Sequence, residues 1–487
     1  MPDHRLTVTV LLAAMVTGCA SPGTPLPRAP ILPNQAWATE ADAIQWPEHA
    51  WWETFDSADL NDWVKRSLAG NAGLREAASR LDAAEAVALQ SRAGTLPRGD
   101  ASASSIYQRY SEHAGHEAPM SGGRGSTNTL DVSLRYSLDF WGRNRAALRA
   151  ALGEAAAQKS EWAAARQILV GKVVQTWVEL AWHLEQQKLF SDAVAVRQRR
   201  LQLVRQRVAA GLDSPSASLQ AEAEVSESLS DLAGIKEAIA RRRHALAELA
   251  GEGVQAADGL TPALADPAAL DIPAAIPATL LGRRADVVAA RQRVEAADAR
   301  TEHARASFYP DVNLRAFAGL TSLGLSQWLE AGSRTYGLEP AISLPLFDGG
   351  RLRGELKQRE AEYNQAVEQY NGLILRAARE VADALASIDA VAQQRDRQRH
   401  VIATAEAAHA LALRRYAQGQ DSHLSVLATE TSWLDARATG IDLRARALEL
   451  QAELAVALGG GFGSTAHSSP SAASEASSQT AAAARLP

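Results

Sequence analysis

The chain has 487 residues, which is long for one compact core and suggests two or three structural units. Charged residues make up 22% of it, yet the net charge is only −6. This balance argues against a nucleic-acid partner, which would favour a basic face. The single cysteine, Cys19, excludes a disulfide framework within the chain.

The N-terminus has the pattern of an export signal. An apolar run from Leu6 to Val16 follows Arg5, is too short to span a bilayer, and is followed by Thr17, Gly18 and Cys19. This pattern resembles a bacterial lipoprotein box. The resemblance implies a signal peptide at 1–18 and an N-acyl diglyceride lipid, including palmitate, on Cys19. Ala20 at the next position implies sorting to the outer membrane. The alternative is an ordinary signal peptide with an incidental cysteine.

Two segments predict little packed structure. Residues 19–45 begin with five prolines between Ser21 and Pro33, which is typical of an extended, unpacked tether. Residues 460–487 are rich in Gly, Ser and Ala without periodicity, which predicts a disordered tail.

The region between these segments is an internal repeat. Gly211 and Asp213 recur as Gly419 and Asp421 at an offset of about 208 positions, and the match extends from Gly142 to Gly251. We therefore divide the chain into a first structural repeat at 46–258 and a second at 259–459. Each is predicted to run helix, two strands, long helix, glycine turn and returning helix.

The long helices are indicated by apolar periodicity and by two long windows without proline. Leu169, Val173, Trp177, Leu180 and Leu184 recur at spacings of three and four residues, which is an apolar stripe at helical period. We expect helical hairpins at 143–251 and 351–458. The first helix of each hairpin would be roughly 100 Å long, which favours coiled-coil packing.

Strict alternation predicts strands with two different faces. In the segment TLDVSLRYSLDF, apolar side chains from Leu130 to Phe140 alternate with charged or small polar ones. We expect strands at about 101–113, 128–140, 311–321 and 335–347.

Alternation of this kind fits either a sheet covering a core or a transmembrane barrel. The export signal and the lack of an obvious core partner favour the barrel. Four strands cannot close one alone, so two copies would supply eight strands and three copies twelve.

Several motifs together resemble the TolC-type outer-membrane efflux family, in its lipoprotein branch. They are WWETFDSADLNDWVKRSLAGN, SLRYSLDFWGRNRAA, ASFYPDVNL and ISLPLFDGGRLRGEL, and the resemblance covers about 46–459. It implies a mainly α-helical protein with a membrane β-barrel, in which a homotrimer shares twelve strands above a periplasmic helical tunnel. It also implies a periplasmic membrane-fusion adaptor and an inner-membrane pump of the RND type as partners, and outer-membrane lipid around the barrel.

The function implied is a passive export duct for small molecules in a tripartite efflux system. A duct for type I protein secretion is the near alternative. A lipid-anchored periplasmic coiled-coil scaffold without a barrel is the alternative from another class.

The two glycine turns are the candidate sites. Gly can adopt positive φ where each hairpin turns back, and the Asp and Ser that follow can cap the returning helix. Local chemistry alone predicts only a turn, whereas the resemblance implies adaptor docking. The residues concerned are Val208, Gly211, Leu212, Asp213 and Ser214 in the first turn, and Gly419, Gln420, Asp421 and Ser422 in the second.

The resemblance also implies a closed periplasmic gate at Tyr416 and Asp421. The best-known family member has an arginine where Asp421 stands, so the same link cannot form. The family's acidic rings would fall at Ser425 and Ala428, which are uncharged, and this leaves Glu430 as the available substitute.

Catalytic signatures are missing from the sequence. The segment FDGGR lacks the Lys-Ser/Thr end of a phosphate loop, and no Ser nucleophile has a Gly-x-Ser-x-Gly context. We therefore expect no enzyme, no metal site and no cofactor besides the lipid.

Overall fold

The computed structural model describes residues 22–32, 50–113, 121–267 and 284–462. The predicted signal peptide at 1–18, the lipid site Cys19 and nearly all of the tail at 460–487 lie outside the described residues. The chain divides into two compact units. Unit 1 comprises 1–31, 80–159 and 289–371, and unit 2 comprises 32–79, 160–288 and 372–487.

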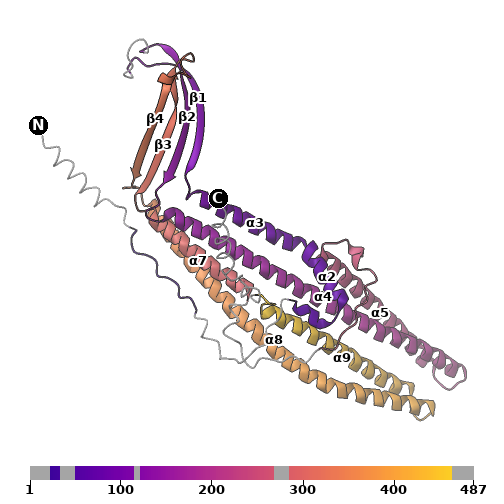
Figure 1. The fold of residues 1–487 in the computed structure, drawn as a ribbon. Helices are drawn as coiled ribbons and strands as arrows, with labels where there is room; N and C mark the ends of the chain where they lie inside the picture. Colours follow the sequence, from indigo (N-terminus) through magenta and orange to yellow (C-terminus); the bar gives the residue numbers. More distant parts are fainter. Residues whose placement is uncertain (1–21, 33–49, 114–120, 268–283, 463–487) are drawn as a thin grey trace, which may run out of the picture. The chain divides into compact units, whose positions relative to one another are not determined.

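The units do not follow the two sequence repeats. In unit 1 the strands of both repeats form one four-stranded antiparallel sheet, in the order β1-β2-β3-β4 (Figure 1). Two strands alone would be marginally stable, so each repeat completes its sheet with the other. The strands are β1 Arg98–Arg109, β2 Arg124–Ser137, β3 Asp311–Leu323 and β4 Arg334–Ser343, with a 3-10 turn, η3 Ala331–Ser333, before β4.

The predicted strand bounds need correction by three to four residues at several ends. β1 begins immediately after Pro97, because the register places Arg98 opposite Arg135 and Arg109 opposite Arg124. β2 ends at Ser137 although the alternation continues in the sequence. The carboxylate of Asp139 already accepts hydrogen bonds from the first turn of the next helix. β4 ends at Ser343, two residues before Pro345, which has no N–H to donate to the sheet.

Helices form most of the rest of the described chain. The two longest have 67 residues each, and each is followed by a returning helix, as the sequence predicted (Figure 1). None of the described helices is both long and apolar enough to cross a membrane. The α-helices are α2 Ala58–Gly70, α3 Ala72–Ala93, α4 Arg143–Ala209, α5 Pro215–Ala250, α7 Ala285–Ala306, α8 Arg351–Ala417 and α9 His423–Ala457, and the other 3-10 turns are η1 Trp51–Phe55 and η2 Val254–Ala257.

An aspartate fixes the start of each long helix. Asp139 accepts from the backbone N–H of Asn144 at 3.1 Å, before α4. Asp348 accepts from the N–H of Leu352 at 2.9 Å, before α8. These carboxylates satisfy N–H groups that have no partner within the helix, so strand and helix are joined at a defined residue.

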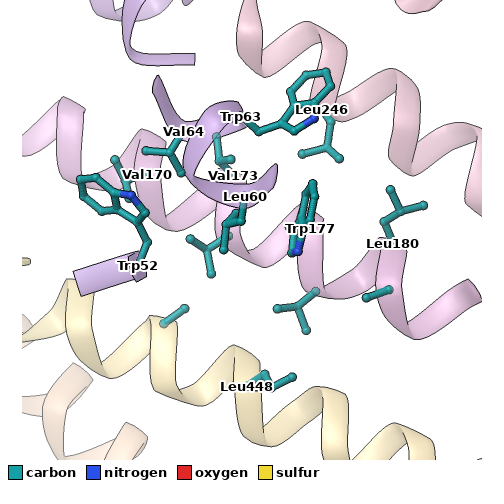
Figure 2. Packing of buried hydrophobic residues seen from close by; sticks show 14 of the residues in the cluster. Trp52, Leu60, Trp63, Val64, Val170, Val173, Trp177, Leu180, Leu246 and Leu448 are labelled. Atoms are coloured by element: carbon teal, nitrogen blue, oxygen red, sulfur yellow. The ribbon is translucent and has the colours of Figure 1, made fainter. Parts of the chain in front are cut away.

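The main core of unit 2 explains the apolar stripe. Figure 2 shows Trp52, Leu60 and Trp63, from η1 and α2, packed with Val173 and Trp177 of α4. Leu60 and Val173 are fully buried. Full burial of such a side chain contributes about 1.5–3 kcal/mol. The predicted stripe therefore holds the short N-terminal helices against the long one.

The proline-rich segment is packed in its described part, 22–32. The N–H of Leu26 donates to Glu360 at 2.8 Å, and the N–H of Ala29 donates to Asn364 at 2.8 Å, both on α8 within unit 1. Arg28 pairs with Asp298 on α7 at 2.6 Å. The prediction of an unpacked tether is wrong for these residues. An extended backbone leaves its N–H groups free, and α8 offers side-chain acceptors at a matching spacing.

Candidate functional site at the ends of the helical hairpins

The two hairpin turns have the same backbone geometry. Gly211 has φ of 73° and Gly419 has φ of 72°, values that favour glycine. The N–H of Gly211 donates to Val208 O and the N–H of Gly419 donates to Tyr416 O, each at 3.0 Å. The repeated sequence therefore encodes a repeated turn, as predicted.

The predicted helix caps form in only one of the turns. The hydroxyl of Ser422 accepts from the N–H of Ser425 at 3.3 Å, so the second turn is capped. Ser214 occupies the same position before α5, but its side chain makes no cap bond and lies 2.7 Å from the Ser216 hydroxyl. Pro215 supplies the pre-set φ of the first helical position instead.

Asp213 of the first turn makes a hydrogen bond to the second hairpin. Sequence analysis predicted Asp421 in this role. The Tyr416 hydroxyl donates to Asp213 Oδ2 at 3.3 Å, and Arg207 Nε donates to the same oxygen at 2.7 Å. The Arg207 guanidinium also lies 4.8 Å from the centre of the Tyr416 ring. All three residues belong to unit 2.

Asp421, the predicted gate partner, is used within its own turn. It accepts from the N–H of Ser422 at 2.8 Å and from the hydroxyl of Ser425 at 3.1 Å. The hydrogen-bond partner of Tyr416 in this structure is therefore Asp213 and not Asp421, and the assignment of Tyr416 to a gate stays a prediction. The uncharged Ser425 thus helps to hold Asp421 in place.

The charges at the tip are arranged for mutual stabilisation. The hydrogen bond from Arg207 and its positive charge lower the pKa of Asp213. Burial raises the pKa of Tyr416, and the neighbouring Asp213 charge adds to this. Both shifts favour a neutral phenol donating to an ionised carboxylate near pH 7.

His423 is a member of the tip that sequence reasoning missed. Its side chain is buried at 6% exposure, and neither ring nitrogen has a hydrogen-bond partner. Its ring lies edge-on to Tyr416 at 5.9 Å. Burial and the nearby Arg200 charge lower the pKa of His423, so this arrangement favours the neutral imidazole.

Glu430 is wrong as a substitute acid in a pore. Its side chain is only 2% exposed, and it faces Arg197 and Arg200 of α4. Ala428 is exposed but carries no charge. The sequence placed Glu430 near the second tip correctly, but it could not indicate which way the side chain faces.

Apolar side chains are exposed around both turns. Leu212 is 67% exposed in the first turn and Leu424 is 59% exposed in the second. Of the predicted docking residues, Gly211, Ser214, Gly419, Gln420 and Ser422 are also exposed, whereas Val208, Asp213 and Asp421 are partly buried.

The sheet of unit 1 is the second functional feature, because its two faces differ in charge. One row crosses all four strands and consists of Arg98, Arg135, Arg315 and Glu339. Arg315 lies 3.4 Å from Glu339 and 3.6 Å from Asp131. The charged side chains of neighbouring strands are therefore paired across the sheet.

The other face of the sheet is apolar and exposed. Val132 on β2 is 58% exposed, and Tyr336, Leu338 and Ile342 on β4 are 84%, 67% and 75% exposed. Exposed apolar patches of this kind mark surfaces that contact another protein or a membrane. The alternation predicted for β2 is thus continued on the neighbouring strands.

A cavity of about 630 Å³ lies in unit 2 between α4, α8, α9 and the first residues of α7. Its walls carry paired charges, including Arg284 with Glu380 at 2.7 Å and Arg446 with Glu453 at 2.9 Å. Within the described ranges, no three His, Cys, Asp or Glu side chains are close enough to hold a metal ion.

A sheet with one charged and one apolar face, together with long helical hairpins, is typical of outer-membrane channel proteins. Comparison with known proteins agrees. The outer membrane efflux protein family matches residues 63–252 and 276–460, and the chain belongs to that family. Proteins of this family and of this fold are channels.

Individual relatives cover most of the chain. The multidrug resistance outer membrane protein MdtP of Escherichia coli K12 is 30% identical over 94% of this chain and 97% of its own length. The fusaric acid resistance protein FusA of Burkholderia cepacia is 32% identical over 72% of this chain and 68% of its own length. The crystal structure of the outer membrane protein VceC from Vibrio cholerae has a TM-score of 0.81 and 35% identity, covering 86% of this chain and 100% of that one.

Proposed function

We propose that three copies of this chain form the outer-membrane duct of a tripartite efflux system. The observation that carries the proposal is the sheet, in which paired charges line one face and exposed apolar side chains cover the other. Only the apolar face can contact lipid favourably, whereas the charged face requires contact with water.

The strand order supports sharing of a barrel between copies. β1 and β4 are the edges of the four-stranded sheet, and a sheet edge in lipid would leave backbone N–H and C=O groups unsatisfied. Pairing β4 of one copy with β1 of the next removes both edges. Three copies give the twelve strands implied by the family.

The hairpin tips are the proposed periplasmic end of the duct. We assign the Asp213 contacts with Arg207 and Tyr416 to a closed gate. We assign the exposed turns, with Leu212 and Leu424, to docking of a periplasmic adaptor that is coupled to an inner-membrane pump of the RND type. A membrane anchor through acylated Cys19 completes the proposal.

The cargo class follows from the relatives. MdtP and FusA are named for multidrug resistance and for fusaric acid resistance. We therefore assign small toxic organic compounds to this duct, with the free energy for transport supplied by the partner pump.

Conductance across a planar bilayer tests the proposal. Purified protein should give discrete, mostly closed channels, and Asp213→Asn should raise the open fraction because it removes the shared acceptor charge. Asp231→Asn, an exposed change on α5, is the matched control and should behave as the unmodified protein. Absence of discrete channels in every variant would contradict the duct.

A further inference from the structure

We propose that a buried ion cluster of Arg197, Arg200 and Glu430 is the principal lock between the two hairpins, and that the Asp213 contact at the tip is secondary. We call these three residues the buried lock. The inference rests on the proposed duct, because it concerns what holds the duct closed.

The buried lock connects the hairpins directly. Glu430 on α9 forms ion pairs with Arg200 and with Arg197 of α4, the latter at 3.5 Å. Arg197 also donates to Ser228 of α5. Helices α4 and α9, from different hairpins, therefore meet at one carboxylate, and α5 joins the cluster through Arg197.

Burial distinguishes this cluster from the contact at the tip. The side chains of Glu430 and Arg200 are 2% and 8% exposed, whereas those of Asp213 and Arg207 are 19% and 28% exposed. Charges interact more strongly where water is excluded, and salt screens them less there. The tip contact is accordingly the weaker of the two links.

Neither of the two buried apolar clusters described near the tip joins the hairpins. Among the described buried clusters in this region, Leu201 packs with Val225 inside the first hairpin, and Tyr416 packs with Val426 inside the second. The nearest buried cluster that spans both hairpins contains Leu189 and is further from the turns. Between that cluster and the turns, the ion pairs of Glu430 and the contacts of Tyr416 with Asp213 and Arg207 link the two hairpins.

The buried lock also has features that lower the free-energy cost of opening it. Burial lowers the pKa of Arg200, so the closed arrangement holds this guanidinium at a cost. Arg200 Nη1, which is not the atom that pairs with Glu430, has no hydrogen-bond partner in the described structure. Opening would hydrate this group, which offsets part of the lost ion pairing.

The proposal predicts that the charge of the Glu430 side chain, and not its size, keeps the channel closed. Glu430→Gln keeps the shape but leaves two arginines facing each other, with only the half-buried Glu224 of α5 to offset them. The ratio of open to closed channels should rise on the order of 100-fold, because an unpaired buried charge disfavours the closed state. The double variant Arg200→Met with Glu430→Met leaves neither partner of the closest pair charged and should stay closed.

Planar-bilayer conductance of the full-length protein measures both effects. Glu222→Gln is the matched control, since Glu222 pairs with Arg205 within the first hairpin at 3.2 Å and is exposed. It should leave the open fraction unchanged, and Asp213→Asn should open the channel less than Glu430→Gln does. If Glu430→Gln does not assemble, Glu430→Asp, which keeps the charge on a shorter arm, should give an intermediate open fraction.

Two results would overturn the inference. One is a Glu430 variant that remains as closed as the unmodified protein while Asp213→Asn opens. The other is a double methionine variant as open as Glu430→Gln, which would mean that packing and not charge pairing closes the duct. If no variant conducts at all, the proposed duct itself fails, and this outcome is distinct from both.

Discussion

Acidification should open the hairpin tips through His423. In the closed tip its imidazole is buried and its pKa is lowered by that burial and by Arg200. The charged groups around it are Arg200 and Arg207 of α4 and Asp213 of the first turn, and the Tyr416 phenol of α8 lies against its ring. Protonation therefore adds a positive charge beside Arg200 and Arg207, and Asp213 is the carboxylate among the charges that act on His423.

The sign and size of the effect follow from linkage. A histidine exposed in the open tip would have a pKa of about 6.5, so the closed state keeps its full stability above that pH and loses it below. Between pH 7.5 and 5.5 the open-to-closed ratio should rise up to about tenfold per chain, or about 1.4 kcal/mol. Arg207 holds the pKa of Asp213 below its usual value, so this carboxylate stays ionised across the window.

Conductance at the two pH values checks this reasoning. His423→Phe keeps a ring beside Tyr416 but cannot titrate, and it should lose the pH response. His400→Phe is the matched control, because His400 lies exposed on α8 of the same hairpin, and its variant should keep the response. An unchanged pH response in His423→Phe, or tighter closure at pH 5.5, would refute the argument.

Two further predictions test the packing and the sheet. Gly211 and Gly251 have similar φ of 73° and 69°, but a Cβ at Gly251 would lie 2.0 Å from Gly70 O, whereas one at Gly211 would meet nothing within 4 Å. Gly211→Ala should cost about 1–2 kcal/mol and Gly251→Ala about 1–3 kcal/mol more, measured as thermal unfolding by tryptophan fluorescence; equal losses would contradict the close approach. In the sheet, Ser104→Cys should react with a charged thiol reagent in liposomes and Ala103→Cys should not, because neighbouring residues of a strand face opposite sides; equal labelling would contradict the assigned faces.

Much of the fold could be predicted because its signals are local and periodic. The stripe through Val173 and Trp177 repeats at helical spacing, and the alternation from Leu130 onward repeats at strand spacing. Strand ends were less accurate, since the end of β2 depends on the Asp139 cap and the start of β1 depends on pairing with β2.

The gate contacts depend on pairing between distant segments, which the sequence does not display. Asp213 and Tyr416 are 203 positions apart, and nothing near Tyr416 favours Asp213 over the closer Asp421. One signal for Glu430 was available. Val426, Glu430 and Leu434 are spaced by four residues, so the glutamate interrupts a buried stripe of α9. A charged residue in that position indicates a buried partner rather than a pore wall.

Single-particle imaging of the detergent-extracted protein tests the central claim most directly. The proposed duct predicts threefold-symmetric particles in which three sheets close into one twelve-stranded ring. Monomers, twofold particles, or helical particles without a closed ring of strands would contradict it.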